Sequence, residues 1–200
     1  MGKERLRRIF RDPHARGAFF LYFGAAFHFL YGGFRLFTGI LYRALRVDAT
    51  AFFYLSLALS RIVLLRAYRD GERGARRAFA CRLAGRVLFV AVGIMMLLIA
   101  ETLSGRGRAP YPFYALLVSG GYAITSATLS TLELLYLGRL RSPILSASRA
   151  VSLASAVLSV FNFLTDVFSA FALRLTLGAL TLFFVLFFAV GLSVQEKSDA

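Results

Sequence analysis

Residues 18–41, AFFLYFGAAFHFLYGGFRLFTGIL, form a long apolar stretch near the N-terminus. His28 and Arg35 are its only basic side chains, and it has no acidic one. A helix needs about 20 mainly apolar residues to cross about 30 Å of hydrocarbon, so this stretch is long enough to span a membrane. It is too long for the apolar region of a secretory signal peptide, which covers about 7–15 residues. We therefore expect a first membrane-spanning helix here.

Five further apolar stretches follow, separated by basic, glycine-containing or proline-containing breaks. A basic loop is expected over residues 66–86. Ser142 and Pro143 are suited to cap and begin the helix that follows them. The sequence thus predicts an all-α polytopic membrane protein, a six-transmembrane-helix bundle at residues 17–195, between a basic segment at 1–16 and a short tail at 196–200. The six spans are expected at about 18–41, 49–65, 87–103, 111–137, 143–168 and 173–194.

The overall composition excludes the other broad classes. The chain has 200 residues, of which 58% are hydrophobic and only 17% charged. Such a composition leaves a soluble domain too little polar surface, and it contains too much apolar material for a disordered chain. Cys81 is the only cysteine, and His14 and His28 are the only histidines. A disulfide framework, a cysteine-based zinc site and a histidine-rich metal cluster are therefore excluded.

The basic residues are unevenly distributed. The formal net charge is +14, from 24 Lys and Arg against 10 Asp and Glu. Most of the basic residues fall before the first stretch or between alternate stretches, which is the pattern of the positive-inside rule rather than of nucleic-acid binding. We expect a multi-pass protein of the cell membrane with both termini cytoplasmic and no nucleic-acid partner.

The basic N-terminal segment has two open interpretations. Leu6, Ile9 and Phe10 recur at helical spacing among arginines, which is typical of a short amphipathic helix on anionic lipid. A disordered basic tail that only sets the topology is the alternative.

Polar residues inside the predicted spans are candidates for function, because burying them in lipid is unfavourable. We expect Arg61 to meet Glu133 if the second and fourth spans touch, and Arg35 to join Glu101 and Asp166 near the outer side. Either a substrate path or structural pairing explains them. The substrate-path candidates are Glu133, Asp166, Arg35, Arg61, His28, Ser126, Ser130, Ser155 and Asn162.

Small polar residues form stripes on the fourth and fifth spans. Ser126, Ser130 and Glu133 share one helix face, and a serine stripe at residues 148, 152, 155 and 159 follows on the next span. Such stripes allow close helix packing, including in a homodimer, and they also suit a polar path. His28 fits a hydrogen-bonded packing residue or a ligand.

No catalytic constellation is present. The sequence lacks a nucleophile with a neighbouring base, a phosphate-binding glycine loop and an H-E-x-x-H motif. We expect no enzyme activity, no cofactor and no resident metal.

Two short motifs resemble the transmembrane domain of the cation diffusion facilitator family. They are RLFTGILYRA at residues 35–44, which is similar to the end of that family's first helix, and SPILSA at 142–147, which is similar to its entry to helix five. The resemblance implies six spans, cytoplasmic termini and cation efflux. It fails at the metal ligands, because Phe53, Leu57, Val151 and Ser155 occupy the positions where the family carries His or Asp pairs.

These observations together predict a secondary-transporter-like carrier of a small solute or ion, built on a degenerate cation-efflux-like scaffold in the lipid bilayer. The alternative is a non-transporting interaction or scaffold protein, or a subunit of a membrane complex. Loss of transport without loss of folding would separate the two.

Overall fold

The computed structural model describes residues 12–71, 74–103, 112–137 and 142–167, together with residues 179–181, 183, 185–187 and 190. These residues form helices and short turns, with no strand among them. The predicted amphipathic segment before residue 12 and the tail at 196–200 lie outside this described part. The helices are α2 (Pro13–Tyr42), α3 (Leu45–Arg69), α4 (Gly74–Leu103), α5 (Phe113–Leu137) and α6 (Pro143–Val167).

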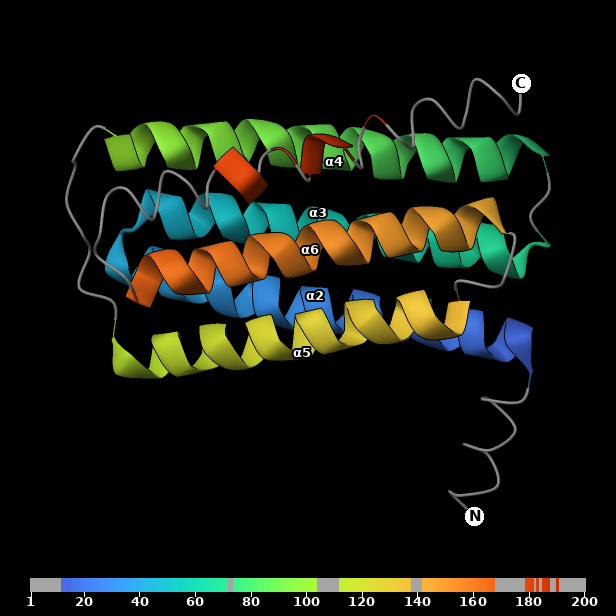
Figure 1. The fold of residues 1–200 in the computed structure, drawn as a ribbon, viewed down its shortest axis with the longest axis horizontal. Coiled ribbons are helices and arrows are strands. Elements are labelled where there is room, and N and C mark those ends of the chain that lie inside the picture. Colours follow the sequence, from blue (N-terminus) through green and yellow to red (C-terminus); the bar gives the residue numbers. More distant parts are fainter. Residues whose placement is uncertain are drawn as a thin grey trace, which may run out of the picture.

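The helices run up and down along one long axis (Figure 1). Helices α2, α3, α6 and α5 pack in a ring, each against the next, and α4 covers α3 and α6 from outside. Within the described chain, no Cα atom of α3 comes within 8 Å of a Cα atom of α5. Helices α3 and α5 are therefore diagonal partners, and side chains fill the space between them.

Two helix starts follow from local chemistry. The Asp12 side chain accepts a hydrogen bond from the His14 backbone N–H at 2.9 Å, and Pro13 occupies the first turn of α2. Pro13 thus begins the first long helix, five residues before its predicted start. The Ser142 hydroxyl accepts a hydrogen bond from the Leu145 backbone N–H at 3.3 Å, which confirms the predicted cap of α6.

The basic loop predicted over residues 66–86 is wrong. Helix α3 continues to Arg69, and α4 begins at Gly74. The reason is an apolar stripe, because Ala80, Ala84 and Leu88 recur every four residues and are fully buried. Arg82 and Arg86 on the same segment are exposed instead, so the region is an amphipathic helix and not a loop.

Four helices, α2, α3, α5 and α6, are long and apolar enough to cross a membrane. Their outer faces carry large apolar side chains, such as Leu30 at 71%, Ile124 at 72% and Phe113 at 74% exposure. The predicted third span lies within α4. The predicted sixth span is described only at helical positions between 179 and 190, where Thr181 and Val185 are buried. The architecture is that of a helical membrane protein.

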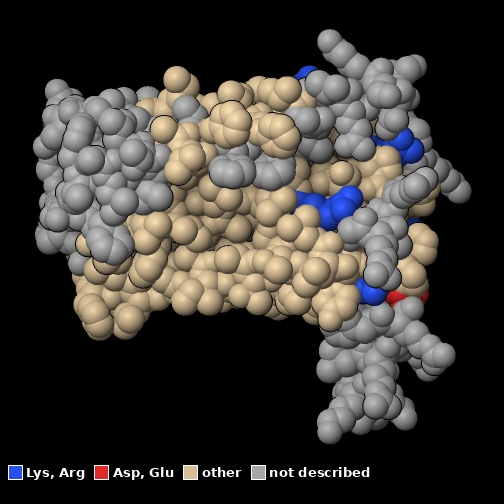
Figure 2. All heavy atoms as spheres, in the orientation of Figure 1, with Lys and Arg blue, Asp and Glu red and all other residues tan. Residues whose placement is uncertain are grey.

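Basic side chains are unevenly placed on one face of the bundle. On the face shown in Figure 2, the described Lys and Arg atoms lie toward the right-hand end. This is the end where α2 begins and where the chain passes from α3 to α4 and from α5 to α6 (Figure 1). Tan atoms cover the middle of that face, as expected for a surface in contact with lipid.

The interior is unusually polar for a bundle with an apolar exterior. A hydroxyl, imidazole, guanidinium or carboxylate group is buried at many positions of α2, α3, α5 and α6. The charged, imidazole, amide and serine members of this set are His28, Arg35, Ser60, Arg61, Ser119, Ser126, Ser130, Glu133, Ser148, Ser152, Ser155, Ser159 and Asn162.

Candidate functional site

An ion pair crosses the bundle interior. A guanidinium nitrogen of Arg61 lies 2.9 Å from the Glu133 carboxylate, and each side chain is only 2% exposed. Arg61 comes from α3 and Glu133 from α5, the two helices that face each other diagonally. The expected pairing of Arg61 with Glu133 is therefore confirmed, and the two helices meet through side chains while their Cα atoms stay more than 8 Å apart.

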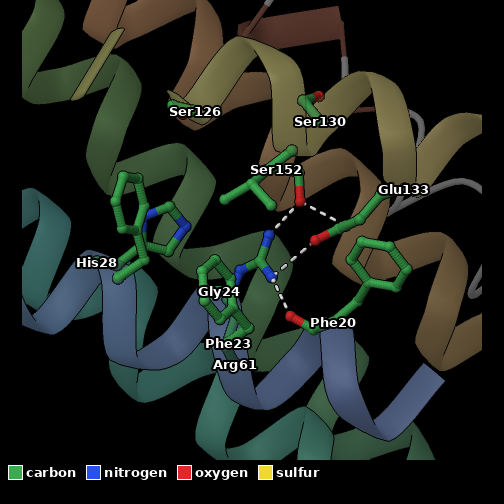
Figure 3. Close-up of a pocket in the computed structure, with 11 residues that line it drawn as sticks. Phe20, Phe23, Gly24, His28, Arg61, Ser126, Ser130, Glu133 and Ser152 are labelled. Atoms are coloured by element: carbon green, nitrogen blue, oxygen red, sulfur yellow. Dashed lines mark hydrogen bonds and ion pairs between the residues drawn. The ribbon is translucent and has the colours of Figure 1, made fainter. Parts of the chain in front are cut away.

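Helices α2 and α6 complete the surroundings of this pair (Figure 3). Arg61 donates to the Phe20 backbone carbonyl at 3.2 Å and to the Ser152 hydroxyl. Ser152 in turn donates to the second oxygen of Glu133, and Ser148 lies 3.4 Å from that same oxygen. One ion pair thus ties together four helices.

The absence of a side chain at Gly24 creates the space for the guanidinium. A Cβ atom at Gly24 would lie 1.9 Å from Nη1 of Arg61, far inside contact distance. Nothing lies within 4 Å of the Cβ position of Gly33, on the same helix. Gly24 is therefore a requirement of the ion pair, whereas Gly33 is not.

A small pocket opens beside the ion pair, between α2 and α5, and has room for roughly one water molecule. Figure 3 shows His28 pointing across it toward Arg61. Three buried atoms of its lining have no hydrogen-bond partner among the described residues: Nε2 of His28, Nε of Arg61 and Oγ of Ser130. The lining residues are Phe20, Phe23, Gly24, Phe27, His28, Arg61, Ser126, Leu129, Ser130, Glu133 and Ser152.

A chain of hydroxyl groups continues from the pocket. Nδ1 of His28 lies 2.7 Å from the Tyr122 hydroxyl. That hydroxyl lies 3.3 Å from Oγ of Ser155, which is 3.4 Å from Oγ of Ser126. His28 is thus a hydrogen-bonded buried residue, as the first of its two interpretations proposed.

Three tyrosine rings pack beside this chain. The rings of Tyr31 and Tyr122 are stacked with centroids 3.5 Å apart, and Tyr54 meets both edge-on, at 4.9 and 5.2 Å. Such aromatic packing joins α2, α3 and α5 at the centre of the bundle.

Arg35 anchors a second polar cluster, on the far side of the tyrosines. It donates to the Tyr31 hydroxyl and to the Ser119 hydroxyl, both at 2.8 Å, and these two hydroxyls lie 3.0 Å apart. The predicted cluster of Arg35 with Glu101 and Asp166 lies in part outside the described structure, which leaves out both carboxylate side chains. Asn162 is buried on α6.

Sequence reasoning missed four contributors: Tyr31, Ser119, Tyr122 and Ser152. Nothing in the spacing of the tyrosines shows that their hydroxyls meet polar groups on other helices. Ser152 belonged to the serine stripe predicted to serve helix packing or a polar path, and no partner was predicted for it. The helical spacing of α5 could have identified two of them, because Ser119 and Tyr122 lie on the same helical face as Ser126 and Ser130.

The positions that correspond to cation diffusion facilitator ligands belong to the packed interior. Phe53, Leu57, Val151 and Ser155 are each at most 1% exposed. No family model matches this sequence, and no curated protein or solved structure shows significant similarity to it. The function must therefore be argued from the geometry alone.

Proposed function

We propose that this protein is a secondary-transporter-like carrier that moves a small solute or ion across the cell membrane. The observation that carries the proposal is the Arg61–Glu133 ion pair, which lies in the wall of an internal pocket. Charged residues inside a membrane bundle are unfavourable unless they are paired, and they mark ion or proton pathways in many membrane proteins. A carboxylate with an exchangeable partner is the element that such a mechanism needs.

The polar groups extend along the bundle. Glu133 and Arg61 lie in the half nearer the basic end, the His28–Tyr122–Ser155 chain comes next, and the Arg35 cluster follows. Hydroxyl, imidazole and carboxylate groups at these distances can exchange protons. The pocket is the size of a water molecule, so the cargo at this point of the path is a small ion or a proton rather than a large solute.

The arrangement in the membrane is part of the same proposal. We infer six spans and cytoplasmic termini, because the described Lys and Arg atoms on the face shown in Figure 2 lie toward the end where α2 begins. The N-terminal basic segment then lies against anionic lipid. Cysteine-accessibility labelling of single cysteines in a Cys81→Ser background tests this orientation.

A scaffold or complex subunit is the second candidate function. It is favoured by the number of hydrogen bonds that the ion pair makes, because it bonds to α2 and α6 as well as across the diagonal. A purely structural pair would have the same contacts. Small residues on α5 and α6 also permit tight packing, including with a second copy of the chain.

Reconstitution separates these two functions. Purified protein in liposomes is given a proton gradient, and the uptake of small cations, anions and neutral solutes is recorded for wild type and Glu133→Gln. A carrier moves at least one solute, and the variant loses that flux while it stays folded. A scaffold gives no flux with any solute.

A further inference from the structure

We propose that the pocket beside Arg61 binds one small monovalent anion, of halide size, when Glu133 takes up a proton. This inference names the solute of the proposed carrier and rests on that function for movement across the membrane. Binding itself is measurable without transport.

The first argument is the supply of unused donors. Within the part of the chain that the structure describes, Nε of Arg61, Oγ of Ser130 and Nε2 of His28 have no hydrogen-bond partner, and these residues are only 2%, 2% and 3% exposed. All three residues line the same pocket. A buried polar atom without a partner is rare in folded proteins, so these atoms indicate a ligand or water at this position.

The chemistry of these atoms requires an acceptor. An arginine Nε–H can only donate, and a serine hydroxyl readily donates. If the Tyr122 hydroxyl donates to Nδ1 of His28, the neutral imidazole carries its proton on Nε2 and adds a third donor. The pocket therefore suits a species that accepts several hydrogen bonds, which is a water molecule or an anion.

The charge balance decides between these two. Around Glu133, α3 presents Arg61, α2 presents His28, and α6 presents the hydroxyls of Ser148 and Ser152. With Glu133 ionised, the pair is neutral and water fits. With Glu133 protonated, the Arg61 charge is left unbalanced in a medium of low dielectric, and an anion restores neutrality.

Two more distant groups do not change this balance. Arg149 on α6 donates from Nε to the Leu145 carbonyl of its own helix. Tyr136 on α5 is 44% exposed and stacks on Phe20. Among its described residues, helix α4 packs against α3 and α6 and contributes none to the lining.

The charge balance around Glu133 couples the binding of a proton to the binding of an anion. By linkage, each of the two strengthens the other.

The size and walls of the pocket define the class of anion. Room for roughly one water excludes sulfate or a carboxylic acid and leaves the monatomic halides as the class of anion to test. Phe20, Phe23 and Phe27 form the α2 wall, so the anion must give up much of its hydration. Bromide is the chosen probe because it is weakly hydrated, and it requires a small outward shift of the lining side chains.

The test uses the full-length protein in detergent micelles. Bromide is titrated by calorimetry and thermal shift at about pH 5 and about pH 8, because a site that takes up a proton together with the anion binds the anion more tightly at the lower pH. We expect binding at least about tenfold tighter at the lower pH, a difference of about 1.4 kcal/mol. Sodium sulfate at equal ionic strength is the control for screening and is expected to have no effect.

Variants test the assignment of each group. Glu133→Gln imitates the protonated carboxyl and should bind bromide equally at both pH values. Ser130→Ala removes one donor and should weaken binding about fivefold. Ser159→Ala is its matched control, because Ser159 is also buried but donates to the Ala156 carbonyl of its own helix; its affinity should be that of wild type.

Three outcomes overturn the inference. They are no bromide effect in wild type at either pH, an equal effect of sulfate, and a pH dependence that persists in Glu133→Gln and disappears in His28→Gln. If Glu133→Gln does not fold, the inference is tested by the pH dependence of bromide binding in wild type and by the bromide affinity of Ser130→Ala. Bromide binding without any flux in liposomes would refute the carrier and leave the site, whereas flux of another solute without bromide binding would refute the site and leave the carrier.

Discussion

Arg61 and Glu133 are joined by a 2.9 Å ion pair across the diagonal of the helix ring, although no Cα atom of α3 lies within 8 Å of one of α5 in the described chain. The length of the arginine side chain makes this contact possible. Serine hydroxyls from α6 and a backbone carbonyl from α2 surround the two charges. Any change in the pair therefore alters contacts with all four helices of the ring.

The first prediction concerns the two ways of removing the pair. Arg61→Met leaves Glu133 buried without its counter-charge and should lower the free energy of unfolding by about 3–5 kcal/mol. The double variant Arg61→Met/Glu133→Leu replaces both charges with apolar side chains and should regain most of that loss. Equilibrium unfolding in mixed micelles measures both. A double variant as unstable as the single one would contradict this view of the pair.

The second prediction compares two glycines of α2. Gly24→Ala places a methyl group where Nη1 of Arg61 lies and should destabilise the protein by about 1–3 kcal/mol through overpacking. Gly33→Ala meets open space and should be neutral or stabilising by up to about 1 kcal/mol. Thermal unfolding of the purified variants tests the difference, and equal effects would show that Gly24 is not specifically required.

The third prediction concerns the central tyrosine. Tyr122→Phe keeps the stacked ring but removes the hydroxyl that bonds to His28 and Ser155. A buried imidazole nitrogen then loses its partner, and we expect a loss of about 1–3 kcal/mol in stability. Tyr42→Phe is the control, because its hydroxyl pairs with Tyr114 at an exposed end, and its effect should stay within about 0.5 kcal/mol.

The fourth prediction concerns the second polar cluster. Ser119→Ala removes a hydroxyl that accepts from Arg35 and lies 3.0 Å from the Tyr31 hydroxyl. The expected cost is about 1–3 kcal/mol. Ser56→Ala, whose hydroxyl donates only to the Phe52 carbonyl of its own helix, should change the stability by less. A reversed order of the two variants in thermal unfolding would argue against a stabilising role of this cluster.

Hydropathy predicted much of the fold. The positions of α2, α3, α5 and α6 agree with the predicted spans to within a few residues, because an uninterrupted apolar stretch leaves few alternatives. Residues 66–86 were mistaken for a loop because arginine density concealed the stripe of Ala80, Ala84 and Leu88. In a short window, exposed arginines on an amphipathic helix look like a hydrophilic connection.

The candidate site was only partly predictable. Charge and depth were enough to match Arg61 with Glu133, since each is unfavourable in lipid without the other. The roles of Tyr122 and Ser152 depend on which helices are neighbours, and one sequence does not specify that order. Gly24 lies on the buried face of α2 and Gly33 on its exposed face, but the side chain for which Gly24 leaves space, Arg61, comes from another helix and is not revealed by a local pattern.

Flux through the double variant tests the central claim most directly. Wild type and Arg61→Met/Glu133→Leu are reconstituted at equal protein density, and proton-driven solute flux is recorded after equal thermal stability has been confirmed. The account predicts flux in wild type and its loss in the stable double variant, because the exchangeable carboxylate is gone. Undiminished flux in the double variant would show that the ion pair is structural and that any transport path lies elsewhere.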